Sequence, residues 1–503
     1  MPNIFCILND RMNSGLERNT SVPVFRMPLS ACFLLSLAIV SFWFVTADAG
    51  EWRLEKSLSG SLIYTDNARL TDAEKRDDLI FNVRPGLRLR GKGRRVDLDL
   101  AYSPSINLHT DTRQRNDINH FLDFSSVLDL YQDRYFLDVR ANASIVNIVR
   151  DLPSSDLALA NNNTTQSYRY TIRPNFRHRL KSYGILSGAL GYSETRFTES
   201  RSSDVATSSV NLRFDETRWI NRIDGYVDYN YRNLMREDRS DSFSSVFTTG
   251  LVYHINTFWG VTATLGYENG NFEVSDGQTP EGVRWNIGGI WTPSSRVRAS
   301  ASAGRRFFGA DYALDVEYRH RRSVVAASYR TSFQTAGGST LFQGSNFPSL
   351  DAFGNPVETP ISNQGGRVNG TTPSLSSEVF REDRFDLSWV LRGRRHSLTT
   401  RAFYRRREYG ESLRDETDTG VSGNITHNLS ARSSLFGRAT WDILDERDRN
   451  REFVRYSLEI GFSRQLGPKT TTRFSVTRRA GDYTDDTPDY TEHRISASIS
   501  HRF

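Results

Sequence analysis

Residues 454–463 read VRYSLEIGFS, and apolar and polar side chains alternate along them with a period of two. The apolar set is Val454, Tyr456, Leu458, Ile460 and Phe462. Between them stand Arg455, Ser457 and Glu459. Because successive side chains of a strand point to opposite faces, such a strand presents one face to an apolar medium and the other to water. The stretch therefore predicts a strand in the wall of a transmembrane barrel.

The same alternation recurs in residues 312–319 and 384–392, and no segment after Gly50 shows sustained helical spacing. Such stretches run about 9–14 residues, which is enough for a tilted strand to cross a bilayer. Strands of soluble sandwiches are shorter, most often about five or six residues. We therefore predict an all-β fold, a transmembrane antiparallel up-and-down β-barrel.

The composition agrees with half-buried strands. Mean hydropathy is −0.54, yet 12% of the 503 residues are aromatic, whereas disordered chains are poor in aromatic residues. The chain carries 65 basic and 59 acidic residues, a net charge of +6. The excess of positive charge is small compared with the number of charged residues of either sign. This balance indicates intermixed ion pairs and argues against a nucleic-acid-binding surface.

The N-terminal segment has the features of a cleavable signal peptide. An apolar run at 29–45 follows Arg26 and ends in the small-x-small pattern formed by Ala47 and Ala49. We therefore predict a signal peptide at residues 1–49, with Met12 or Met27 as alternative starts, and a barrel at residues 50–503. Cys6 and Cys32 both lie in the predicted signal peptide. The mature chain is thus expected to hold no disulfide and no thiolate metal site.

Connections between the predicted strands alternate between tight and loose. The tight ones are 91–93, 132–134, 181–182, 293–295, 393–395 and 467–469; the loose ones are 67–77, 150–166, 237–241, 274–281, 410–416, 446–451 and 485–490. Outer-membrane barrels show this asymmetry, with short periplasmic turns and longer external loops. The pattern predicts about 22 strands, within a range of about 18–22. Both termini are expected on the periplasmic side, which requires an even number of strands.

One predicted external loop, residues 335–379, is rich in Gly, Ser, Asn, Thr and Pro. Loops of this length are uncommon and are usually functional or disordered. Two interpretations stay open: the loop folds into the lumen as a constriction, or it lies at the cell surface.

The first predicted hairpin allows a register to be proposed. With Lys92 and Gly93 as a two-residue turn, Leu89 faces Val96 and Arg88 faces Asp97, an opposite-charge pair on the polar face.

The chain ends in RISASISHRF, residues 494–503. Ile495, Ala497, Ile499 and the terminal Phe503 share one face of this last strand. A final strand that ends in an aromatic residue resembles the signal read by the barrel assembly machinery of the outer membrane, although His501 stands where that pattern usually has an apolar or aromatic residue. The expected partners are therefore the assembly machinery and outer-membrane lipid.

The polar faces of the predicted strands give the candidate lumen lining. Its members are Arg84, Arg88, Asp97, Asp99, Asp224, Asp228, Asp386 and Glu459, with Asn82, Arg90 and Arg232 beside them. One interpretation is a selectivity lining for a charged solute. The other, which the near-balance of signs favours, is a charged ladder that hydrates and holds the wall.

The sequence shows no motif for catalysis or for a cofactor. The nine histidines are scattered without metal-ligand spacing, and neither a phosphate-binding loop nor a nucleophile elbow is present. We therefore predict no catalytic, cofactor-binding or metal site and no enzymatic activity. A hydrolase on the barrel wall is the least favoured alternative.

Residues 55–105 carry a resemblance to a known family. Its features are LSGSLIYTDN at 58–67, DLIFNVRPGL at 78–87 and a Gly-Lys-Gly turn followed by an alternating strand at 91–102. This segment resembles outer-membrane β-barrels associated with PEP-CTERM/exosortase systems, within a broader group of β-barrel porins. The resemblance implies a Gram-negative outer-membrane protein in a setting of exopolysaccharide production, and it carries over no catalytic or binding residue.

Two functions of different classes follow as hypotheses. The first is a passive channel for exopolysaccharide or envelope-matrix export, working with export proteins. Barrels of this size are commonly plugged, but the first predicted strand begins almost at the cleavage site, so no N-terminal plug is expected. The second is a non-conducting structural or docking barrel that anchors surface matrix through its loops, which bulky lumen residues such as Phe136 and Tyr226 would favour.

Overall fold

The computed structural model describes residues 50–111, 117–147, 163–198, 204–216, 222–237, 240–272, 279–334, 380–409, 415–446, 450–484 and 489–503. These residues form 24 strand segments: β1 (Glu51–Thr65), β2 (Asp78–Lys92), β3 (Val96–Tyr102), β4 (Ser105–His109), β5 (Asp117–Asn119), β6 (Leu122–Tyr131), β7 (Tyr135–Asn147), β8 (Thr164–Leu180), β9 (Gly184–Phe197), β10 (Val205–Glu216), β11 (Ile223–Arg236), β12 (Ser242–His254), β13 (Trp259–Gly270), β14 (Gly282–Ser294), β15 (Val297–Arg306), β16 (Gly309–His320), β17 (Ser323–Gln334), β18 (Phe380–Arg392), β19 (His396–Tyr409), β20 (Asp415–Asn428), β21 (Ser433–Glu446), β22 (Arg451–Gly467), β23 (Thr470–Tyr483) and β24 (Tyr490–Arg502). Within the described ranges, no helix is long and apolar enough to cross a membrane.

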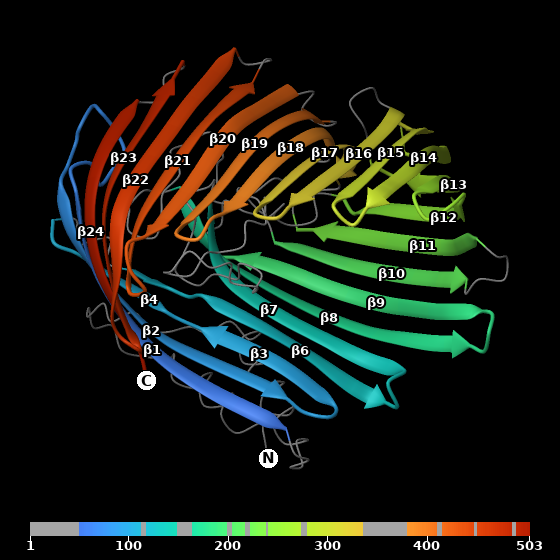
Figure 1. Ribbon diagram of the computed structural model, residues 1–503, viewed down its shortest axis with the longest axis horizontal. Coiled ribbons are helices and arrows are strands. Elements are labelled where there is room, and N and C mark those ends of the chain that lie inside the picture. Colours follow the sequence, from blue (N-terminus) through green and yellow to red (C-terminus); the bar gives the residue numbers. More distant parts are fainter. Residues whose placement is uncertain are drawn as a thin grey trace, which may run out of the picture. The chain divides into compact units, whose positions relative to one another are not determined.

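The strands close into a barrel (Figure 1). From β6 to β24 each segment pairs antiparallel with the next, and β1 pairs both with β2 and with β24, from Ser57 opposite Arg502 to Thr65 opposite Arg494. β3 and β4 continue one register on β2, and β5 and β6 continue one register on β4 and β3. Each of these pairs of segments is one interrupted wall strand, so the 24 described segments make 22 wall strands. The prediction of an antiparallel barrel of about 22 strands is confirmed.

The interruption between β3 and β4 has a local cause. Pro104 lies in the gap and carries no backbone N–H to donate to a neighbouring strand. Beside it, the Ser103 N–H donates to the Phe121 carbonyl at 2.8 Å, within the matching gap of the partner strand. The ladder is thus broken at the proline and resumes in the same register beyond it.

The two rims of the barrel differ. We call the rim that carries the connections 93–95, 132–134 and 181–183 the short-turn rim, and the opposite rim, which carries 66–77, the long-loop rim. β1 begins and β24 ends at the short-turn rim, where the Phe503 N–H donates to the Lys56 carbonyl at 2.9 Å. At the long-loop rim, Phe307 and Phe308 alone join β15 to β16.

Two sequence predictions fall on residues that lie outside the described ranges. One is the signal peptide at 1–49, with its alternative starts Met12 and Met27 and its cleavage pattern at Ala47 and Ala49. The other is the long loop at 335–379. These stay predictions.

The barrel is apolar outside and polar inside. On β22, Ile460 is 60% exposed on the outer face while the neighbouring Glu459 is 8% exposed on the inner face. Leu265 of β13 and Phe474 of β23 are likewise exposed on the outer face. Apolar surface on this scale has to be covered, and a lipid bilayer is the medium that covers the outside of a closed barrel.

Aromatic residues mark the edges of this outer apolar surface. Trp259 and Trp291 stack at the short-turn end of β13 and β14, with their ring centroids 5.8 Å apart. Tyr267 lies eight residues further along β13, roughly 26 Å at the rise of a strand. Because barrel strands tilt by about 35–45°, this spacing spans roughly 20 Å of membrane thickness, which is most of the apolar band of about 25 Å between aromatic girdles.

The proposed register of the first hairpin is wrong by four residues. Gly93 and Val96 close a turn with Arg94 and Arg95 at its tip, so Arg88 lies opposite Ala101 and Lys92 opposite Asp97. Because the shift is an even number, every side chain keeps its predicted face. Only the cross-strand partners change.

Candidate functional site

The first group of predicted lumen residues lies on β2 and β3. Arg88 forms a two-pronged ion pair with Asp99, with Nε–Oδ1 at 3.1 Å and Nη2–Oδ2 at 2.6 Å, and Arg90 lies 3.4 Å from the same carboxylate. Arg84 donates to Ser105 Oγ at 3.4 Å and lies in the same inward-facing set as Arg88. Asp97 is exposed next to the short-turn rim.

The second group lies on β11. Asp224 contacts the exposed His254 of β12, with Nε2–Oδ2 at 2.8 Å. Asp228 accepts a hydrogen bond from the Asn230 side chain two residues further along the same face. Tyr226 lies between these two aspartates in the inward-facing set, and the Arg213 guanidinium lies 4.3 Å from its ring centroid.

The remaining predicted residues belong to what we call the charged wall, the inward-facing side chains of β18–β24. Asp386 accepts from Arg401 Nε at 2.9 Å and also pairs with Arg384. Glu459 pairs with Arg438 at 3.2 Å. Arg407, with its side chain 1% exposed, lies between Glu382 and Glu416 at 2.8 and 3.5 Å. These long side chains neutralise one another along the wall, as buried charges must.

The inner face of β12–β15 differs from the charged wall because it is built mainly from small residues. Across three neighbouring strands, Thr262 lies opposite Gly288, and Gly288 lies opposite Ser302. Gly250, Gly260, Gly266, Ser300 and Gly304 belong to the same inward-facing set. The lumen therefore has one side lined by long charged groups and another lined by small ones.

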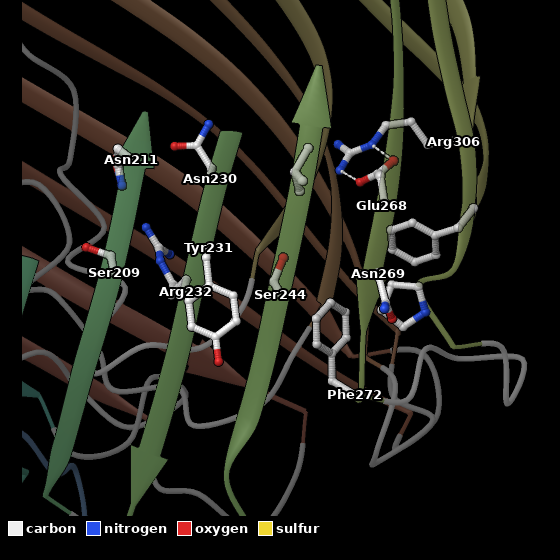
Figure 2. A pocket seen from close by; sticks show the side chains of 13 residues that line it. Ser209, Asn211, Asn230, Tyr231, Arg232, Ser244, Glu268, Asn269, Phe272 and Arg306 are labelled. Carbon is white, nitrogen blue, oxygen red and sulfur yellow. Dashed lines mark hydrogen bonds and ion pairs between the residues drawn. The ribbon is translucent and has the colours of Figure 1, made fainter. Parts of the chain in front are cut away.

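A cavity of about 290 Å³ opens on the inner wall of β10–β15 toward the long-loop rim (Figure 2). Its polar lining comes from five strands: Ser209 and Asn211 of β10, Asn230 and Arg232 of β11, Ser244 of β12, Glu268 of β13 and Arg306 of β15. Three aromatic residues, Tyr231, Phe272 and Phe307, also line it.

One ion pair of this cavity is fixed. Glu268 is 3% exposed and accepts from Arg306 through both oxygens, with Nε–Oε1 at 2.9 Å and Nη2–Oε2 at 2.5 Å. The Arg306 guanidinium also lies 4.9 Å from the ring centroid of Phe308. A two-pronged pair held against an aromatic ring is both strong and geometrically defined. It therefore forms a fixed side of the cavity, and Arg284 approaches the same carboxylate to 4.0 Å.

Sequence reasoning named Arg232 but missed the rest of this cavity. Its lining spans residues 209–307, and only the strand register brings Glu268 beside Val246 and places Arg306 within reach. The available signal was a charge on the polar face near the end of each of three consecutive strands: Glu268, Arg284 and Arg306. Without the register, that signal cannot be distinguished from an ordinary charged ladder.

No metal centre emerges from the described part of the chain, where no group of three or more His, Cys, Asp or Glu side chains is placed to hold an ion.

Comparison with known proteins identifies a fold. No family model and no curated protein matches this sequence. Among solved structures, a ferric enterobactin receptor mutant of Pseudomonas aeruginosa is 10% identical with a TM-score of 0.51, covering 89% of this chain and 80% of the receptor. The FrpB iron transporter of Neisseria meningitidis is 9% identical with a TM-score of 0.53, covering 89% and 82%. By fold, the chain is an outer-membrane β-barrel.

A third solved structure with a similar fold is the siderophore receptor PirA of Acinetobacter baumannii. It is 8% identical with a TM-score of 0.52, covering 90% of this chain and 80% of the receptor. At such identities the likeness shows a shared barrel architecture alone.

Proposed function

We propose that this barrel is a passive outer-membrane channel for hydrophilic, carbohydrate-type material, with exopolysaccharide or envelope-matrix polymer as its cargo. The observation that carries the proposal is the small-residue lining of β12–β15, where Thr262, Gly288 and Ser302 adjoin across the wall. Short polar side chains leave lumen space free and hydrate it, which suits diffusion of a polar chain.

The proposal includes an orientation of the barrel. We place the short-turn rim in the periplasm, together with both termini, and the long-loop rim at the cell surface, as in other outer-membrane barrels. Export proteins on the periplasmic side would deliver the polymer. The link to exopolysaccharide rests on the resemblance of residues 55–105 to barrels of PEP-CTERM/exosortase systems.

A docking barrel that conducts little is the second candidate, and one feature favours it. A buried apolar cluster lies at the long-loop rim: Leu70, Leu444, Phe453, Tyr483 and Tyr490. Leu70 belongs to the connection 66–77, which the Asp72 N–H ties to the Asp489 carbonyl at 2.9 Å. The buried cluster fixes this connection on the rim, so its exposed residues 72–77 form an ordered surface that suits attachment of surface material.

The test is solute efflux from proteoliposomes. Refolded protein is reconstituted with two trapped fluorescent oligosaccharides, a short one and a polymer of several tens of sugar units. The channel proposal expects both to leave faster than from protein-free vesicles. Retention of both by vesicles whose protein is verified as folded would contradict the channel and leave the docking barrel. Release of the short sugar alone would contradict the polymer cargo.

A further inference from the structure

The cavity on β10–β15 contains polar groups that the protein itself does not satisfy. In the described ranges, the side chains of Ser209, Asn211, Arg232 and Ser244 make no hydrogen bond or ion pair with other protein groups. In a hydrated lumen such groups bind water, and a ligand that offers equivalent hydrogen bonds can replace that water. Four such groups facing one cavity (Figure 2) indicate a binding site.

The strand register arranges these groups in two parallel rows. In the first row Arg232 lies between Ser209 and Ser244. In the second row Asn211 lies opposite Asn230. Neighbouring strands lie about 4.8 Å apart. The two rows therefore offer hydroxyl, amide and guanidinium groups at spacings comparable with those between the substituents of one sugar ring.

The charge of the cavity indicates which chemical groups a ligand should carry. Glu268 is shared between Arg306, through the two-pronged pair, and Arg284 at 4.0 Å. This one carboxylate does not offset both guanidinium groups, and Arg232 adds a further positive charge to the lining. A guanidinium binds a carboxylate through two parallel hydrogen bonds, whereas side-chain amides both donate to and accept from hydroxyls. The lining thus suits a ligand with one carboxylate and several hydroxyls.

Size and apolar surface agree with this chemistry. The volume of about 290 Å³ is at the lower end of ligand cavities, which suits a single ring. Phe307, backed by the largely buried Phe272, gives the lining an apolar part that suits the apolar face of such a ring.

We propose that this cavity is a binding subsite for one uronic-acid-type unit, a hydroxylated ring that carries a carboxylate. Arg232 binds the carboxylate, and Asn211, Ser209 and Ser244 bind hydroxyls. The inference rests on the proposed carbohydrate conduit and specifies its substrate as an acidic polysaccharide.

Calorimetric titration of the folded full-length protein in detergent tests the subsite. The probes are trigalacturonic acid and, as the neutral counterpart, maltotriose. Trigalacturonic acid is expected to bind more tightly than maltotriose. Arg232→Gln is expected to weaken trigalacturonic acid binding at least tenfold, and Arg232→Lys by less, because lysine keeps the charge without the planar fork.

The matched control is Arg298→Gln, which removes a lumen-facing arginine near the short-turn end of β15, away from the cavity. It is expected to leave affinity unchanged. Equal weakening by Arg298→Gln would show general charge attraction and overturn the subsite, as would equal binding of both sugars or no binding at all. The titration needs no membrane, so it tests binding separately from conduction. A barrel that binds trigalacturonic acid but does not conduct would contradict the channel proposal and leave the binding subsite standing.

Discussion

The Thr65 hydroxyl of β1 donates to Glu492 Oε1 of β24 at 2.9 Å, so the first and last strands are joined by a buried side-chain hydrogen bond as well as by their ladder. Glu492 is fully buried and also pairs with Arg494 at 2.8 Å and Arg479 at 3.8 Å. One carboxylate thus serves three partners at the point where the barrel closes. Removing it leaves two arginine side chains without this partner inside the wall.

Glu492→Ala is therefore expected to destabilise the folded barrel by about 3–5 kcal/mol, the cost of breaking a buried ion pair from one side. Tryptophan fluorescence during urea unfolding in detergent measures the change. Glu452→Ala is the control, because Glu452 lies on the same side of the barrel with an exposed side chain, and it is expected to shift stability by less than about 0.5 kcal/mol. Equal effects of the two variants would show that the closure does not depend on Glu492.

Arg407 permits a related test within the charged wall. Arg407→Met keeps most of the side-chain volume but leaves Glu382 and Glu416 without their shared cation, and a loss of several kcal/mol is expected. Adding Glu382→Gln to Arg407→Met removes one of the uncompensated charges and should recover part of that loss in the same urea titration. A double variant as unstable as the sum of its single variants would contradict coupling of these groups.

Side-chain alternation is testable on β15 with single cysteines, in a background where Cys6 and Cys32 are replaced by serine. Ser302 faces the lumen and Ala301 faces outward. In proteoliposomes a charged, membrane-impermeant thiol reagent should label Ser302→Cys rapidly and Ala301→Cys slowly. Mass spectrometry gives the two rates, and equal labelling would contradict the assignment of faces.

Substitution of Phe503 is expected to affect assembly of the barrel in the membrane but not the stability of the folded barrel. It is 65% exposed and follows β24 at the short-turn rim, so Phe503→Ala should change the unfolding free energy by less than about 1 kcal/mol. If the terminal strand is read by the assembly machinery, the amount of barrel in the outer membrane should fall severalfold. Phe474→Ala, which removes a lipid-facing phenylalanine of β23, is expected to leave that amount unchanged.

The two faces of the wall were predictable because a strand alternates strictly, as Glu459 and Ile460 show. The partner of Arg88 was not, because a turn at Lys92-Gly93 and a turn at Arg94-Arg95 satisfy the same alternation. The cavity on β10–β15 could not be predicted from the sequence, for a similar reason. Ser209 and Arg306 are distant in the chain, and only the accumulated register of the strands between them places both in one lining.

Single-channel recording in a planar bilayer tests the central claim most directly. With refolded wild-type protein in a simple potassium chloride solution, an open polar lumen predicts a large, steady conductance that rises with salt concentration. Insertion of verified folded protein without any conductance would contradict the open channel.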